Sequence, residues 1–201
     1  MTANSTRMAP MVSDEDLERA EAYILIGHVF KGPPSRETLD FLAEFEGDDS
    51  PLGQAVAALA TAARAIDVEG GELEYGALFI AATEKTDTSP YAAVHRTGSH
   101  FGQALIDLRE DLAVLGIAKR EGELEPEDHV SALCDVMAGL VSGRLGGEAA
   151  GDQAPAFFRK HLLTWMPTFF AAVAARAEQP FYAAVADFAR LFLESEAALY
   201  R

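Results

Sequence analysis

Apolar residues recur along most of this chain at spacings of three and four residues, which is the period of an α-helix. The clearest run consists of Phe101, Leu105, Leu108, Leu112 and Leu115. Ser99 can cap the start of this helix, and Gly116 can end it in a left-handed conformation. No segment shows the sustained apolar and polar alternation of a half-buried strand. The pattern therefore predicts an all-α fold, a single globular helical bundle of about eight to ten helices.

Capping residues place the ends of the first helices. Ser13 and Asp16 form a capping-box pattern in front of a helix that the glycine and prolines at 32–34 end. Ser35 can cap a short second helix. Ser50 and Pro51 fit the N-cap and first position of a third helix, because the N–H that proline lacks would have no partner there.

Glycines and prolines divide the rest of the chain. Gly70 and Gly71 are expected to end the third helix, and helical sequence resumes over 72–82. Pro126 is expected to open a helix, residues 154–176 are expected to be helical with a kink or break at Pro167, and Pro180 starts the last helix. We expect a flexible N-terminal leader at 1–12 and a helical domain at 13–201, with a possible hinge in the glycine-rich stretch 143–151.

Net charge restricts the class of partner. The chain has 32 acidic and 16 basic residues among 201, a formal charge of −16. Nucleic acids and anionic membranes attract basic surfaces, so both are disfavoured as partners, whereas cationic partners are favoured. The alternative is that the charge only keeps the protein in solution. Without an apolar run of about 18 residues or a signal-peptide pattern, we expect no stable membrane insertion and a cytoplasmic location.

Common catalytic patterns are missing from the sequence. There is no Glu-x-x-His or His-Glu-x-x-His metal motif and no glycine-lysine phosphate loop, and the one cysteine, Cys134, lies in an apolar segment. These absences remove the commonest enzymes compatible with helices, and we expect no catalytic residues, no cofactor and no metal. An atypical metal-dependent helical enzyme that uses His95, His100 and His129 remains an alternative.

Three segments carry residues that a plain helical bundle does not need. The first is 125–130, where Glu125 and His129 stand four residues apart and could meet across one helical turn to accept an arginine from a guest peptide. An acidic helix cap explains the same residues. The second segment, 74–95, and the third, 157–167, can equally be read as packing faces rich in aromatic residues.

In this order, the three segments resemble the TorD/DmsD family of redox-enzyme maturation chaperones, relatives of the NarJ type. The first match is E-Y-x-x-L-F followed by P-Y, at 74–79 and 90–91. The second and most specific is E-P-x-D-H at 125–129, and the third is F-x-x-x-H-L-x-x-W-x-P at 157–167. Many relatives have an acid and a serine after P-Y, whereas this chain has Ala92 and Ala93.

This resemblance implies a cytoplasmic chaperone without catalytic activity, acting as a monomer or homodimer. Such proteins bind the twin-arginine signal peptide or the apo form, or both, of the catalytic subunit of a molybdenum-cofactor oxidoreductase of the DMSO-reductase class. They assist cofactor insertion and delay export. By the same resemblance, the peptide- or client-binding residues are Glu125, Pro126, Asp128, His129 and Tyr91. The alternative function from another class is a helical ligand-binding or adaptor domain of a regulator.

Overall fold

The computed structural model describes residues 12–81, 87–99, 102–118, 126–146 and 150–201, and within these ranges it contains α- and π-helices but no β-strand. The α-helices are α1 (Asp14–Lys31), α2 (Arg36–Ala43), α3 (Pro51–Ala65), α4 (Val68–Tyr75), α5 (Ala92–Thr97), α6 (Gln103–Val114), α7 (Val130–Val141), α8 (Ala150–Phe157), α9 (Met166–Arg176) and α10 (Pro180–Leu199). Two π-helical turns, η1 (Gly76–Ile80) and η3 (Phe158–Leu162), directly follow α4 and α8. The predicted all-α class is confirmed.

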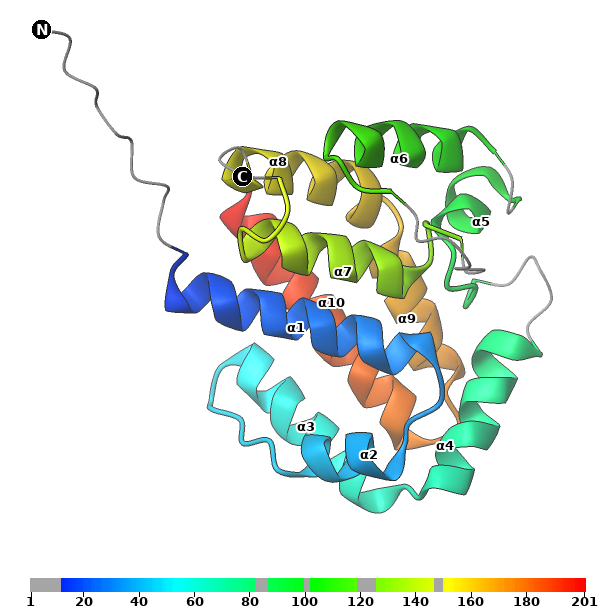
Figure 1. Ribbon diagram of the computed structural model, residues 1–201. Helices are drawn as coiled ribbons and strands as arrows, with labels where there is room; N and C mark the ends of the chain where they lie inside the picture. Colours follow the sequence, from blue (N-terminus) through cyan, green and yellow to red (C-terminus); the bar gives the residue numbers. More distant parts are fainter. Residues whose placement is uncertain (1–11, 82–86, 100–101, 119–125, 147–149) are drawn as a thin grey trace, which may run out of the picture.

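Two long helices, α1 and α10, organise the bundle. Figure 1 shows α1 and α7 side by side, with α10 crossing behind α1. The helix α10 also packs against α3 and α9, and α2 covers part of α3. Within the described ranges, no helix has both the length and the apolar character that a membrane crossing requires.

Phe30, near the end of α1, lies at the centre of the core. Its ring contacts those of four residues from η1, α9 and α10 at centroid distances of 5.3–6.4 Å, namely Phe79, Phe169, Phe170 and Tyr182. Aromatic pairs contribute about 0.5–1.5 kcal/mol each beyond the area that they bury. This cluster therefore fixes η1, α9 and α10 against α1, so the segment 74–80 is held in place by packing.

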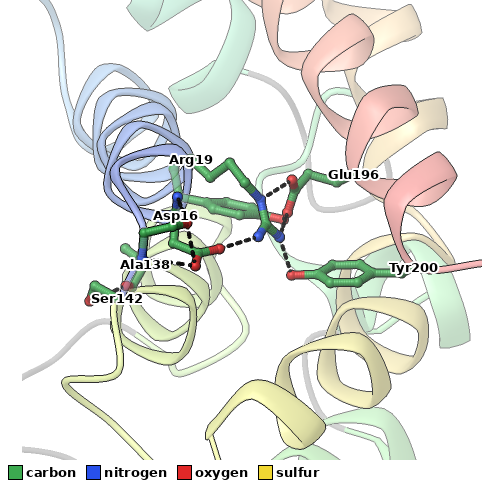
Figure 2. A network of polar contacts seen from close by, with 8 residues as sticks. Asp16, Arg19, Ala138, Ser142, Glu196 and Tyr200 are labelled. Carbon is green, nitrogen blue, oxygen red and sulfur yellow. Dashed lines mark hydrogen bonds and ion pairs between the residues drawn. The ribbon is translucent and has the colours of Figure 1, made fainter. Parts of the chain in front are cut away.

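A network of charged and hydroxyl groups connects the start of α1 to the end of α10. Figure 2 shows the guanidinium of Arg19 between Asp16 on one side and Glu196 and Tyr200 on the other. Arg19 donates to both oxygens of Glu196, with distances of 2.6 and 2.9 Å, and Tyr23 donates to Glu196 Oε2 at 2.9 Å. Burial alone would lower the pKa of Arg19, but the hydrogen bonds and the charge of Glu196 outweigh burial and raise it. The network thus favours the charged form of Arg19.

The predicted caps at the first three helices are confirmed. Ser13 and Asp16 form the reciprocal capping box, and the side chains of Ser35 and Ser50 accept from Thr38 N and Gly53 N. These side chains occupy backbone donors that a helix start leaves without partners. Gly116, expected to end the helix that contains Leu105 and Leu112, has the left-handed φ of +71°.

The prediction that Gly70 and Gly71 end a helix is wrong. The third helix ends earlier, at Ala65, and both glycines lie inside α4, where Asp67 caps the N–H of Gly70. A Cβ on Gly71 would stand only 2.5 Å from Cγ of Pro34. Gly71 therefore allows close packing between α4 and the loop after α1.

Pro167 produces a break between two helices. The chain leaves helical geometry at Trp165, whose φ is −146°, and α9 begins at Met166 with the proline in its first turn. Proline has no N–H to continue the preceding helix and is tolerated at a helix start. The segment 154–176 therefore comprises the second half of α8, the turn η3 and α9.

The predicted leader and hinge lie partly outside the described residues, and both stay predictions. Residues 1–11 and 147–149 are not described. The described part of the glycine-rich stretch is a closed turn, because Leu145 N donates to Gly139 O at 2.9 Å and Gly143 and Gly146 have positive φ. The turn satisfies a carbonyl at the end of α7.

Candidate functional site

The P-Y and E-P-x-D-H motifs meet in space. Tyr91 and His129 form an isolated antiparallel bridge. On either side of it, Val130 N donates to Pro90 O at 2.8 Å and Ala92 N donates to Asp128 O at 3.0 Å. We call residues 90–93 and 126–131, joined in this way, the clasp. It fastens the segment before α5 to the start of α7.

The side chain of Asp128 caps a helix that is distant in sequence. Its Oδ2 accepts from the N–H of Ala93, 35 positions earlier, at 2.8 Å, and the residue is 2% exposed. The helix α5 has only six residues, and its own N-cap residue, Tyr91, gives it no side-chain cap. A short helix is marginal on its own, so Asp128, in the turn before α7, supplies the acceptor that α5 lacks.

His129 is the N-cap of α7. Its Nδ1 accepts from the N–H of Ser131 at 3.2 Å and is 2.7 Å from the hydroxyl of Ser131. Because Nδ1 acts as an acceptor here, this geometry fits a neutral imidazole with its hydrogen on Nε2. The ring also makes an edge contact with Tyr91, with centroids 5.1 Å apart. The imidazole of His129 thus contacts both segments of the clasp, Ser131 in one and Tyr91 in the other.

These contacts correct the predicted positions of the motif residues. Pro126 was expected to open a helix, but α7 begins at Val130, and Pro126 starts a turn in which its carbonyl accepts from His129 N. Asp128 and His129 were expected to meet a guest arginine, yet they are 2% and 3% exposed, because they satisfy backbone donors of α5 and α7. Tyr91 and Pro126 remain partly exposed, and Glu125 lies outside the described residues.

One ion pair attaches α6 to the clasp. Arg109 donates from Nε and Nη2 to the two carboxylate oxygens of Glu127, at 3.0 and 2.9 Å. This hydrogen bonding raises the pKa of Arg109. The helix α6 begins at Gln103 with Gly102 as its N-cap, so the predicted cap at Ser99 is wrong.

The third motif is part of the core. Trp165 donates from its indole nitrogen to His161 O at 2.8 Å, and His161 Nε2 lies 2.6 Å from Asp111 Oδ2. Both the tryptophan and the histidine are buried. His95 stacks near Trp165 at 5.0 Å and donates to Ser89 O at 2.7 Å, which fixes the loop before the clasp. Burial lowers the pKa of both histidines.

A cavity of about 440 Å³ lies at the other end of the segment 74–91. Its lining residues come from α4, from η1 and the residue after it, from the loop before the clasp, and from the end of α9 and its connection to α10: Gly70, Leu73, Glu74, Ala77, Leu78, Ala81, Thr88, Arg176, Glu178 and Gln179. Glu74 was interpreted as part of a packing face, and its burial fits that reading. The sequence signal that could have marked the site is this single acid on a helix face shared with Leu78, one turn further on.

Glu74 is 6% exposed, and its two oxygens have different surroundings. Oε1 accepts from the N–H of Gln179 at 2.6 Å, whereas Oε2 is buried without a hydrogen-bond partner. Burial raises the pKa of this carboxyl, against the opposing effect of the backbone N–H groups of Gln179, Tyr182 and Glu178 at the start of α10. The cavity therefore has a polar group in its wall whose bonding is incomplete.

The described part of the chain contains no cluster of side chains suited to binding a metal ion, and its one cysteine is buried. Within it, no three His, Cys, Asp or Glu side chains gather as a metal site would require, and His100 lies outside it. Cys134 is fully buried, which raises the pKa of its thiol and disfavours the reactive thiolate.

Comparisons with known proteins cover most of the chain. The family described as nitrate reductase delta subunit matches residues 46–171. A chaperone protein TorD from Aliivibrio salmonicida is 26% identical over 197 residues, which cover 88% of this chain and 92% of that one. A Tat proofreading chaperone DmsD from Salmonella typhi is 29% identical over 179 residues, covering 86% and 85%.

A solved structure shares the fold. It is the crystal structure of a protein described as a redox enzyme maturation protein, from Archaeoglobus fulgidus, and it superposes with a TM-score of 0.59 at 22% identity, over 88% of this chain and 93% of that one. The family match spans more than half of the chain, including all three motifs. The chain therefore belongs to the TorD/DmsD family of redox-enzyme maturation chaperones, within the wider family described as nitrate reductase delta subunit.

Proposed function

We propose that this protein is a cytoplasmic chaperone for a molybdenum-cofactor oxidoreductase of the DMSO-reductase class. It binds the twin-arginine signal peptide or the apo form of the catalytic subunit, or both, assists cofactor insertion and delays export, without catalysing a reaction. Family membership supports this function, as do the names of relatives, which are chaperones and a Tat proofreading chaperone. The formal charge of −16 suits a guest that carries arginines.

The observation that carries the proposal is the clasp. Two motifs that the sequence separates come together through backbone and side-chain hydrogen bonds, and they bring the partly exposed Tyr91 and Pro126 to one rim. We propose that Tyr91 and Pro126 contact the client at this rim, and Glu125, which lies outside the described residues, is proposed as a further client contact. Asp128 and His129 stabilise the backbone next to this rim, because their side chains accept hydrogen bonds from backbone N–H groups of α5 and α7.

Isothermal titration calorimetry with the full chain tests this function. The ligand is the leader peptide of a molybdoenzyme from the same organism, and the control is the same peptide with both arginines replaced by glutamine. We expect binding of the arginine peptide that weakens as salt is raised, because exposed charges are screened within about 8–10 Å at 0.1–0.15 M salt. Absence of binding to every such leader and to the apoenzyme would contradict the proposal.

A pair of variants tests the rim. Tyr91→Ala removes the aromatic ring at the clasp, and Phe41→Ala removes an exposed ring from α2 as the matched control. We expect only Tyr91→Ala to weaken client binding, by about tenfold, which corresponds to the loss of one good contact of about 1.4 kcal/mol. Equal affinities of the two variants for the client would show that the client does not contact the clasp at Tyr91.

A further inference from the structure

The cavity beside Glu74 combines an incomplete polar wall with an apolar rim. Leu73 lines the cavity and is 69% exposed, and Ile80, which ends the π-turn that supplies Ala77 and Leu78 to the wall, is 74% exposed. Glu74 Oε2 has no partner. A buried polar atom without a hydrogen bond is costly in free energy, so a donor that reached it would gain more than the same donor at the surface.

The charges around the cavity favour a cation. Arg176 forms an ion pair with Asp87, with Nε and Oδ1 2.6 Å apart, so its charge is compensated. Glu178 adds a second carboxylate to the lining, beside Glu74. The cavity therefore carries excess negative charge, and an anionic ligand is disfavoured.

An arginine side chain matches these features together. Its guanidinium offers five N–H donors and a fixed positive charge, and its methylene stem can lie along apolar surface. The volume of about 440 Å³ is at the lower end of ligand pockets, which suits a side chain with part of its backbone. The last torsion of glutamate is broad, so the carboxylate can turn toward a guest at little cost.

We propose that this cavity receives an arginine side chain of the client polypeptide, whose guanidinium donates to Glu74 and faces Glu178, while Leu73 and Ile80 contact apolar residues that flank the arginine. The inference rests on the proposed chaperone function and assigns a recognition subsite to it, separate from the clasp rim. The π-turn η1 supplies Ala77 and Leu78 to the wall, and such turns are frequent at functional sites.

A double-mutant cycle measures the proposed pair. Glu74→Gln keeps the size of the side chain and an acceptor for Gln179 N–H, and Glu72→Gln, at an exposed position of the same helix, removes the same charge as a control. The peptides are the leader with its two arginines and versions in which one arginine at a time is citrulline, a neutral isostere. Calorimetry gives the four affinities of each cycle.

We expect Glu74→Gln to weaken the arginine peptide about tenfold or more, as a charge-assisted hydrogen bond predicts, and to change the affinity for one citrulline peptide much less. Glu72→Gln should stay within about twofold of the parent chain, as is usual for an exposed charge. Equal effects of Glu74→Gln and Glu72→Gln on the arginine peptide would overturn the inference, and so would equal effects of Glu74→Gln on all peptides.

Methyl NMR of the alanines locates the bound peptide. Ala77 and Ala81 line the cavity, Ala92 and Ala93 lie in the clasp, and Ala58 lies in a groove on α3 as a remote control. We expect shifts at Ala77 and Ala81. Binding with shifts confined to Ala92 and Ala93 would overturn the cavity subsite and leave the chaperone function standing, whereas absence of heat and shifts with every leader would reject both.

Discussion

Two buried glutamates of this chain have opposite surroundings. Glu196, 2% exposed, uses both carboxylate oxygens, which accept from Arg19 and Tyr23 at 2.6–2.9 Å. Glu74 is buried to a similar degree, but one oxygen accepts from a backbone N–H and the other has no partner. The first carboxylate joins the two ends of the bundle, and the second lines a cavity. Burial alone therefore does not distinguish an acid that stabilises the fold from one that could bind a ligand. The distinction lies in whether both carboxylate oxygens already have hydrogen-bond partners.

The largest expected effect comes from breaking the complete network. Arg19→Met leaves Glu196 buried without its cation, and loss of one partner of a buried ion pair costs about 3–5 kcal/mol. We expect the free energy of unfolding to fall by at least about 3 kcal/mol in urea denaturation. Arg36→Met is the control, since Arg36 and Asp40 form an exposed pair, and its effect should stay below about 0.5 kcal/mol. Similar losses for both variants would show that the network does not hold α1 to α10.

A third buried carboxylate, Asp128, should have an intermediate effect. Asp128→Ala removes the acceptor for Ala93 N–H, and loss of a helix cap costs about 0.5–2 kcal/mol. We expect faster hydrogen exchange at the amide of Ala93 and a smaller change at Ala92, whose partner is the backbone carbonyl of Asp128. Asp187→Ala, at an exposed position of α10, is the control. Unchanged exchange at Ala93 would contradict the capping role.

Glu74→Gln should have the smallest effect on stability, and a favourable one. Burial raises the pKa of Glu74 above its ordinary value of 4.5, so the folded chain holds this proton more tightly than the unfolded chain. Its contribution to stability is thus full below pH 4.5 and is lost as pH rises through the raised pKa. Glutamine does not ionise, so Glu74→Gln avoids that loss. The free energy of unfolding of the variant should exceed that of the parent by up to about 1 kcal/mol at pH 7 and by less at pH 4.

Urea denaturation of both chains at several pH values measures this difference. Glu72→Gln, which replaces an exposed acid, should show no comparable rise with pH. A Glu74→Gln chain that is less stable than the parent at pH 7 would mean that Oε2 has a partner in solution, and the contrast with Glu196 would then disappear.

Local signals were enough to predict much of the fold. The caps at Ser13, Ser35 and Ser50 and the proline at the start of α10 act on residues within one helical turn, so the sequence carries them directly. The glycines of α4 were misread, since the close approach of Pro34 to Gly71 is a tertiary contact that no local pattern announces.

The candidate site was predicted less completely, for the same physical reason. The motifs identified Tyr91, Pro126, Asp128 and His129, but the helix α5 was missed because its cap comes from Asp128, 35 positions away. Asp128 and His129 were expected to be accessible because their spacing suits a guest arginine. In the structure their side chains instead accept hydrogen bonds from the backbone of α5 and α7. The incomplete bonding of Glu74 depends on where α10 begins, which the helix face containing Glu74 does not encode.

The capping of α5 by Asp128 has a consequence for synthesis of the chain. While the ribosome is still adding the residues between them, the short helix has no acceptor for its first donors and gains little from forming. At roughly 5–20 residues per second, Asp128 is added some seconds after Ala93. Tyr91 therefore takes its final position only once the polypeptide has grown beyond the start of α7, so a truncated product would lack this surface.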